Sequence, residues 1–167
     1  MIVLSELDKL IQETFLIKQL QTIYLKKAYL CKHNNLSNVM IQQVTNGIKI
    51  SVNTKFIGTN YHDERLRYAF SYSISIENQS NDSVQLLNRH WEIFDSLNFI
   101  EIVDGPGVVG LKPILKPGQK HCYSSNCILT SHIGAMNGYY EMVNFTSTKT
   151  FKVHIPTFQL MVSGALN

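Results

Sequence analysis

Cysteine is scarce in this chain, whose 167 residues contain only Cys31, Cys122 and Cys127. An odd number of cysteines at these spacings matches no disulfide framework, which argues against a small disulfide-stabilised secreted domain. The first eight residues carry acidic groups where a signal peptide carries basic ones. No apolar run approaches the roughly 20 residues that are needed to cross a bilayer. We therefore expect a cytoplasmic protein that does not insert into a membrane.

Charge is also sparse, and it is not clustered. Charged residues make up 16% of the chain, and the formal net charge is +3. Residues 44–167 carry ten Lys and Arg residues against nine Asp and Glu residues. Because nucleic-acid-binding proteins concentrate basic residues on one face, we do not expect nucleic acid as a partner. Hydrophobic residues make up 44%, which is enough for one domain with a sizeable core and a short appendage.

Two hydrophobic periods divide the chain. In the first part, apolar residues recur at steps of three and four, which predicts an amphipathic helix with Ser5 as its N-cap. A polar linker, 33–38, follows this pattern. Residues 1–43 are therefore expected to form a helical extension and linker. Met40 is an alternative start, in which case residues 1–39 would not belong to the native product.

From residue 44 onward the period is two, which is typical of half-buried strands. Alternation is clearest at 48–56, 68–77 and 84–94, with a turn at 78–83. Shorter strands are predicted at 99–103, 108–115, 119–129, 138–145 and 150–162. Strand 84–94 would place Leu87, Trp91 and Ile93 on one face and Leu86, Asn88, His90 and Glu92 on the other. We predict an all-β domain over 44–167, an antiparallel β-sandwich of the fibronectin-III/immunoglobulin kind with seven to eight strands.

The segment Gly105-Pro106-Gly107-Val108-Val109-Gly110 has the spacing GxGxxG. In a dinucleotide-binding fold a helix follows this motif, but Pro113 and Pro117 forbid one here. Two interpretations remain: glycines required by tight turns, or backbone N–H groups that bind a small anion. For the second, charge would come from Arg89 or Lys112. The predicted anion-binding residues are Gly105, Gly107, Gly110, Arg89 and Lys112.

Two other groups of side chains suggest chemistry less strongly. His121, Cys122, Cys127 and His132 carry metal-ligand types, but their spacing does not match paired zinc knuckles, and His121 and Cys122 point to opposite faces of a strand. A buried cysteine that packs as a small hydrophobe is favoured, and no metal site or cofactor is predicted.

His90 could act as a general base oriented by Asp82, Asp95 or Asp104. No nucleophile motif accompanies it. We therefore predict no catalytic residue and no enzymatic activity.

Several segments together resemble one known family. They are 44–48, the alternating run from Tyr68 to Asn78, Val84 to Asp95 with Arg89-His90-Trp91, Gly105 to Pro113, Leu115 to Gly118, Tyr123 to Leu129, Gly134 to Tyr140 and Ile155 to Leu160. In this order they cover nearly all of 44–162, and the chain resembles the ApaG domain family. Asn126 stands in place of the usual glycine, and Lys112 where glutamine is common.

The resemblance implies a fibronectin-III-like sandwich without established enzymatic activity. It also implies an association with cobalt resistance and magnesium efflux, use of related domains as protein-recognition modules, and a glycine-rich loop proposed to hold pyrophosphate or a nucleotide. We expect a non-enzymatic module that binds a protein partner through one sandwich face or the loop 104–112. Its role in cation homeostasis would be indirect.

Two alternatives stay open, namely small-anion binding at the loop and direct binding of a divalent transition metal. Exposed strand edges need protection from pairing, so we expect either a homodimer or edges blunted by Pro113, Pro117 and Pro156.

Overall fold

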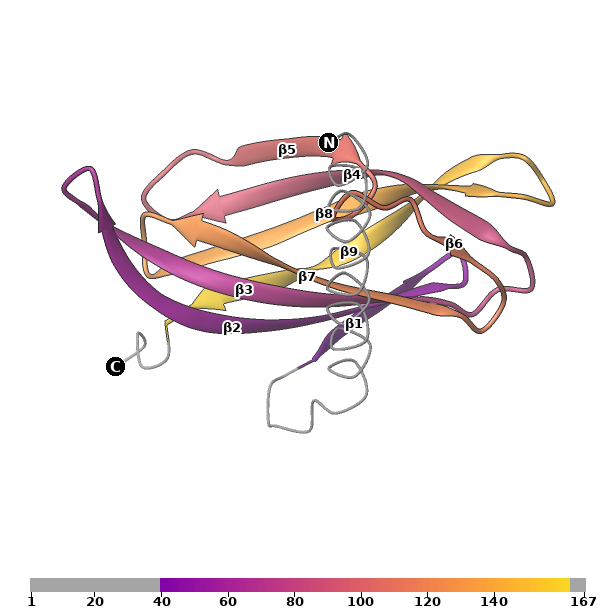
Figure 1. Ribbon diagram of the computed structural model, residues 1–167, viewed down its shortest axis with the longest axis horizontal. Helices are drawn as coiled ribbons and strands as arrows, with labels where there is room; N and C mark the ends of the chain where they lie inside the picture. The colour runs from indigo at the N-terminus through magenta and orange to yellow at the C-terminus, as the bar shows by residue number, and fades with distance from the viewer. Residues whose placement is uncertain (1–39, 163–167) are drawn as a thin grey trace, which may run out of the picture. The chain divides into compact units, whose positions relative to one another are not determined.

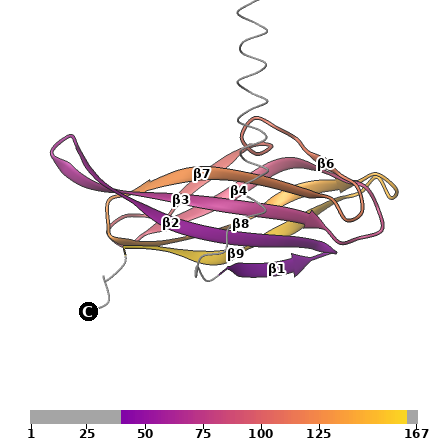
Figure 2. The ribbon, with the colours of Figure 1, turned by 60° about the horizontal axis from the view of Figure 1, so that its bottom comes forward.

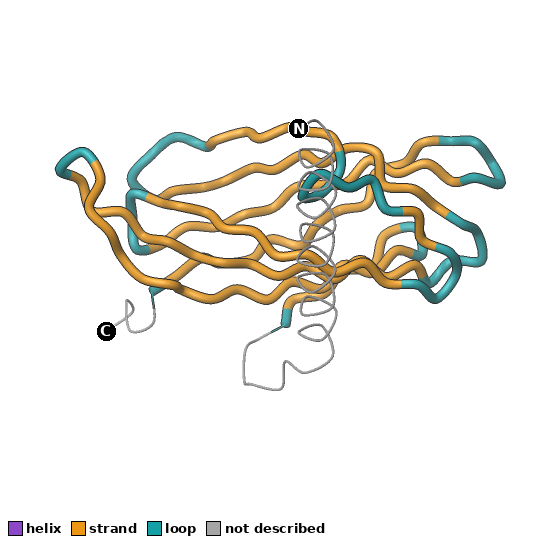
Figure 3. The backbone as a smooth tube through the Cα atoms, in the orientation of Figure 1, coloured by secondary structure: helices purple, strands orange, loops and turns teal. Residues whose placement is uncertain are grey.

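The computed structural model describes residues 40–162 of the chain, and Figure 1 shows their arrangement. Every regular element in this range is a strand (Figure 3). The strands are β1 (Ile41–Thr45), β2 (Ile48–His62), β3 (Arg65–Asn78), β4 (Val84–Asp95), β5 (Glu101–Pro106), β6 (Ile114–Leu115), β7 (Lys120–Leu129), β8 (Ile133–Asn144) and β9 (Thr150–Met161). The predicted N-terminal helix lies outside the described residues and stays a prediction. Within the described residues, no helix is long and apolar enough to span a membrane.

The strands form two antiparallel sheets. One sheet has the order β1-β2-β3-β7, and the other has the order β5-β4-β8-β9 with β6 also beside β4. Figure 2 shows the two layers, with β2, β3 and β7 in front of β4, β8 and β9. The predicted all-β antiparallel sandwich is therefore confirmed. Near the tip of the β2–β3 hairpin, Asp63 and Glu64 turn the chain with positive φ angles, and this hairpin projects beyond the other strands in Figure 1.

The strand count and one strand assignment differ from prediction. The described residues contain nine strands, because the short β1 begins at Ile41, ahead of Val44. The predicted strand 108–115 is wrong over most of its length, since only Ile114–Leu115 forms a strand. Val108 and Leu111 instead make an isolated bridge around Val109 and Gly110. Both of these residues have positive φ, which turns the chain back on itself.

The core lies between the sheets and follows the alternation of the sequence. Ile48, Ile50 and Val52 of β2 are buried on the inner face of the first sheet. From the second sheet, Trp91 lies edge-on to the ring of Tyr72 at 5.6 Å between centroids and to that of Phe158 at 5.9 Å. Trp91 is thus the core tryptophan expected from the sequence, and it joins the two layers.

A β-bulge in β4 changes which leucine is buried. Pairing with β8 shifts between Leu86 and Asn88, which leaves Leu87 as the extra residue. Leu86 is fully buried, whereas Leu87 is only partly buried. The prediction that Leu87 rather than Leu86 shares the face of Trp91 is therefore wrong. Beyond the bulge the alternation holds: Trp91 faces the core, and Asn88, His90 and Glu92 share the outer face.

Candidate functional site

The glycine-rich loop between β5 and β6 is a tight turn that is anchored to the core. Gly107 N donates a hydrogen bond to Leu87 O at 2.9 Å. Val108 N donates to Leu111 O at 2.8 Å, and Leu111 N donates to Val108 O at 3.0 Å. The side chain of Val108 is fully buried. Three amides of the loop thus bind carbonyl groups of the protein itself.

The glycines at 107 and 110 have backbone conformations that favour glycine. Gly107 has φ of 61°, and a Cβ atom there would collide with the carbonyl oxygen of Leu111. Gly110 has φ of 77° and lies at the open tip, where a Cβ would meet nothing within 4 Å. Of the two interpretations of the motif, the structure supports the requirement for tight turns.

Arg89 is directed at the same loop. Its Nη1 atom donates hydrogen bonds to Pro106 O and Gly107 O, both at 3.0 Å. The guanidinium lies against Gly105, and Cγ of Lys112 would lie 3.3 Å from a Cβ at Gly107. Arg89, Gly105, Gly107 and Lys112 are therefore brought together, with Gly110 apart at the tip. Arg89 and three loop amides already have hydrogen-bond partners within the protein. Anion binding by these residues stays a prediction.

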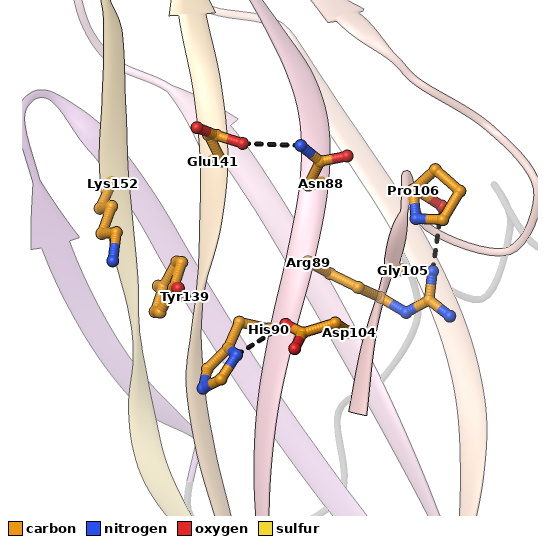
Figure 4. A pocket seen from close by; sticks show the side chains of 9 residues that line it. All are labelled: Asn88, Arg89, His90, Asp104, Gly105, Pro106, Tyr139, Glu141 and Lys152. Carbon is orange, nitrogen blue, oxygen red and sulfur yellow. Dashed lines mark hydrogen bonds and ion pairs between the residues drawn. The ribbon is translucent and has the colours of Figure 1, made fainter. Parts of the chain in front are cut away.

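A groove of about 420 Å³ lies on the outer face of the second sheet, over β5, β4, β8 and β9. Figure 4 shows its lining: Asn88, Arg89, His90, Asp104, Gly105, Pro106, Tyr139, Glu141 and Lys152. Strand pairing places six of these residues in two rows. One row runs from Asp104 through His90 to Tyr139, and the other from Asn88 through Glu141 to Lys152.

The side chains of the groove hold one another in place. His90 Nδ1 lies 2.7 Å from Asp104 Oδ1, and the His90 ring stacks on that of Tyr139 at 4.7 Å. Lys152 Nζ lies 3.8 Å from the centroid of the Tyr139 ring, which therefore lies between Lys152 and His90 (Figure 4). In the second row, Asn88 Nδ2 donates to Glu141 Oε2 at 2.6 Å.

Of the three carboxylates considered as partners of His90, the structure selects Asp104. Asp95 instead accepts hydrogen bonds from the amide and the hydroxyl of Thr130 at 2.7 and 2.6 Å. Asp82 accepts from Asn144 and Thr146. The His90–Asp104 pair resembles a base with its orienting carboxylate. Among the described residues, however, the groove lining contains no serine, threonine or cysteine that could act as a nucleophile.

The hairpin that joins β4 to β5 exposes a group of large apolar side chains. We call this group the hairpin patch; its members are Phe94, Leu97, Phe99, Ile100 and Ile102. Phe99 is 91% exposed and Leu97 is 75% exposed. This patch, together with Tyr139, Glu141 and Lys152 of the groove, was not among the residues predicted from the sequence. A signal for the patch was present, because three of the four residues at 97–100 are apolar (Leu97, Phe99 and Ile100) in a connection between strands that is ordinarily polar.

The four residues considered as metal ligands do not form a site. Among residues 40–162, no three His, Cys, Asp or Glu side chains are placed to hold a metal ion together. Cys127 is buried opposite Phe70, and burial raises the pKa of its thiol to about 11. Cys122 lies on the other face of β7, five residues earlier. The ring of His132 packs against that of Tyr68, with 6.2 Å between the ring centroids.

Comparison with known proteins agrees with this architecture. Residues 58–144 match the family model described as the ApaG domain. The chain is 42% identical over 121 residues to Protein ApaG of Brucella anthropi, covering 72% of this chain and 92% of that protein. It is 41% identical to Protein ApaG of Azotobacter vinelandii, covering 72% and 94% of the two chains.

Solved structures show the same likeness. The crystal structure of a Bordetella pertussis protein named ApaA superposes with a TM-score of 0.65 and 32% identity, over 70% of this chain and 94% of that one. An X-ray structure of a structural genomics target has a TM-score of 0.69 and 36% identity, over 72% and 91%. Fold and sequence together define an antiparallel β-sandwich domain of the ApaG type. The chain belongs to the ApaG family.

Proposed function

We propose that the sandwich domain is a protein-binding module that contacts its partner through the hairpin patch. The patch is the observation that carries the proposal. Exposed apolar side chains scattered singly are normal, but a contiguous group on one hairpin marks an interaction site. Phe99, at 91% exposure, has the size and rigidity of an aromatic anchor that fills a pocket on a partner.

The neighbourhood of the patch supports a binding surface rather than a chemical site. Phe94 and Ile102 lie on the same outer face as the groove, because each is an even number of residues from His90 on β4 or from Asp104 on β5. An apolar centre with a polar rim is typical of protein interfaces. Here the rim consists of groups already fixed to one another, such as His90 with Asp104. Little side-chain entropy would then be lost on binding.

A role in divalent-cation homeostasis, as the family resemblance implies, would be indirect in this proposal. The domain would recognise a protein that handles the ion, and the effect on cobalt or magnesium would pass through that protein. Removal of metal ions by a chelator should then leave binding to the partner unchanged.

Site-specific photo-crosslinking tests the proposal in extracts of the organism from which the chain comes. Benzoylphenylalanine replaces Phe99 in one sample and Ile128 in the control. Ile128 is 58% exposed and lies on β7, in the other sheet. We expect the same small set of proteins to be captured reproducibly at position 99 and not at position 128.

Competition makes the test quantitative. An excess of unlabelled wild-type protein should abolish the crosslinks at position 99, whereas an excess of the variant Leu97→Ser/Ile100→Ser should not. Equal capture at both positions, or equal competition by both proteins, would overturn the proposal.

A further inference from the structure

Strand β5 forms one edge of the second sheet. It pairs with β4 through Glu101 to Pro106, and no strand among the described residues pairs with its other side. An unpaired strand edge is a template for pairing with an additional strand. The hairpin patch continues directly into this edge through Ile100 and Ile102.

The alternation of hydrogen bonds between β4 and β5 shows which backbone N–H and C=O groups of β5 face the free edge. Gly107 N donates to Leu87 O, so the pair 87 and 107 is a hydrogen-bonded pair. In an antiparallel ladder such pairs alternate with pairs whose N–H and C=O groups point away from each other. The pairs Glu92–Ile102 and His90–Asp104 belong to this second kind. The amide and carbonyl groups of Ile102 and Asp104 therefore point to the free edge.

The free edge ends at Pro106. Proline has no N–H group to offer at an outward-facing position. Its carbonyl accepts a hydrogen bond from Arg89, whose side chain passes Gly105 to reach it. Pairing beyond this point is therefore blocked, while the edge at Ile102 and Asp104 is left open. Elements that natural proteins use to block an edge, such as proline or lysine, are absent from 100–105.

The negative charge around β5 indicates which kind of segment would bind to its free edge. Residues 92–106 contain four acidic residues and neither Lys nor Arg, although the whole chain has a net charge of +3. Arg89, the nearest cation on β4, binds the carbonyls of Pro106 and Gly107. A segment that adds to β5 should therefore carry basic side chains beside Glu101 and Asp104, and apolar ones beside Ile102 and Val103.

A second copy of this chain fits the edge poorly. If two β5 strands paired antiparallel with Val103 opposite Val103 of the second copy, the two Asp104 carboxylates would be diagonal neighbours. If they paired with Asp104 opposite Asp104, the two carboxylates would face each other directly. Like charges in such positions destabilise a sheet. Each copy would also bring the same acidic segment to the interface.

We propose that β5 binds an extended basic and apolar peptide segment as an added antiparallel strand. This inference rests on the proposed function and specifies how the partner is recognised. Backbone hydrogen bonds to Ile102 and Asp104 would supply affinity, and the flanking carboxylates with the hairpin patch would supply specificity.

Three capped peptides test this inference on the full chain by NMR titration. The first is Val-Lys-Val-Val-Lys-Val, whose Lys residues can lie beside Glu101 and Asp104 and whose central Val residues can lie beside Ile102 and Val103. The second replaces each Lys by Glu, and the third is the basic peptide with its four central amides N-methylated. We expect the first to shift the amide resonances of Ile102 and Asp104 and to slow their hydrogen exchange about tenfold or more. The other two should do neither.

The variant Ile102→Pro removes one outward amide without removing a bond to β4, and it should abolish binding of the basic peptide. If this variant does not fold, the methylated peptide decides the matter on the wild-type protein. Equal binding of the methylated and unmethylated peptides would overturn strand addition while leaving docking at the hairpin patch intact. Absence of binding by the basic peptide would overturn the inference. Changes in the amide resonances of β5 that depend on protein concentration alone would also overturn it, because they indicate a homodimer.

Discussion

The guanidinium of Arg89 lies against Gly105, so that a Cβ atom at this glycine would stand 3.0 Å from both Nη1 and Nη2. The missing side chain at Gly105 is what allows Arg89 to cross β5 and reach Pro106 O and Gly107 O. The first glycine of the GxGxxG motif thus serves an arginine of the protein itself, and the loop conformation depends on both residues.

Replacement of Gly105 by valine should displace the guanidinium. We expect the free energy of unfolding to fall by about 1–3 kcal/mol, because two charge-assisted hydrogen bonds to the loop are lost. Urea unfolding measures this value. In an Arg89→Ala background, the same substitution should lower the free energy of unfolding by clearly less, since the hydrogen bonds of Arg89 to the loop have already been removed. Equal costs in the two backgrounds would contradict the coupling.

The second and third glycines allow a matched comparison. Gly107→Ala should destabilise the protein by more than about 2 kcal/mol, because positive φ strain adds to a collision with the carbonyl of Leu111. Gly110→Ala has φ strain of the same kind but no collision, and should cost about 1 kcal/mol. Thermal unfolding of both variants checks the order. A reversed order would show that the loop is not held as described.

Two buried tyrosines make stability sensitive to alkaline pH. The hydroxyl groups of Tyr123 and Tyr140 are 2.5 Å apart, and burial raises the pKa of both phenols well above 10.0. Both are neutral in the folded and unfolded states below that value, and the unfolded state ionises first above it. The free energy of unfolding should therefore fall above about pH 10, by at most about 1.4 kcal/mol per pH unit for each tyrosine. In Tyr123→Phe/Tyr140→Phe, urea unfolding at pH 9 and 11 should show a shallower decline; an unchanged slope would contradict this account.

Asp95 should make the opposite contribution at acidic pH. Burial raises its pKa, but hydrogen bonds from Ser131 and Thr130 outweigh that effect and place the pKa below 3.8. The stabilisation is present above the unfolded pKa and is lost as pH falls through the folded value. Asp95→Asn should lower the free energy of unfolding at pH 7 by about 1–3 kcal/mol. The difference from wild type should shrink below pH 4, and a constant difference would show that ionisation is not involved.

Much of the fold could be predicted from the sequence, because side-chain alternation is a local signal. The runs around Ile48, Phe70 and Trp91 gave the strands and the core directly. The bulge at Leu87 could not be found in this way, since one inserted residue changes the phase without changing composition. The strand predicted at 108–115 was wrong over most of its length, because the apolar Val108 and Leu111 that flank the turn at Val109 and Gly110 have the pattern of a strand.

The candidate sites were less predictable, because they depend on pairing between distant strands. Tyr139 and Lys152 reach His90 only through the β4-β8-β9 order, which alternation does not specify. The contacts of Arg89 within the protein could not be predicted for a related reason. Its proximity to the glycine loop was anticipated, but the carbonyl groups that it binds depend on the backbone path past Gly105.

The affinity of the partner captured at position 99 for three purified proteins tests the central claim most directly. Wild type, Phe99→Ser and Ile128→Ser should have similar melting temperatures, since exposed side chains contribute little to stability. Calorimetry should show a dissociation constant raised about tenfold or more for Phe99→Ser, as for the loss of an aromatic anchor, and unchanged for Ile128→Ser. An unchanged affinity for Phe99→Ser would contradict the assignment of the hairpin patch as the binding surface.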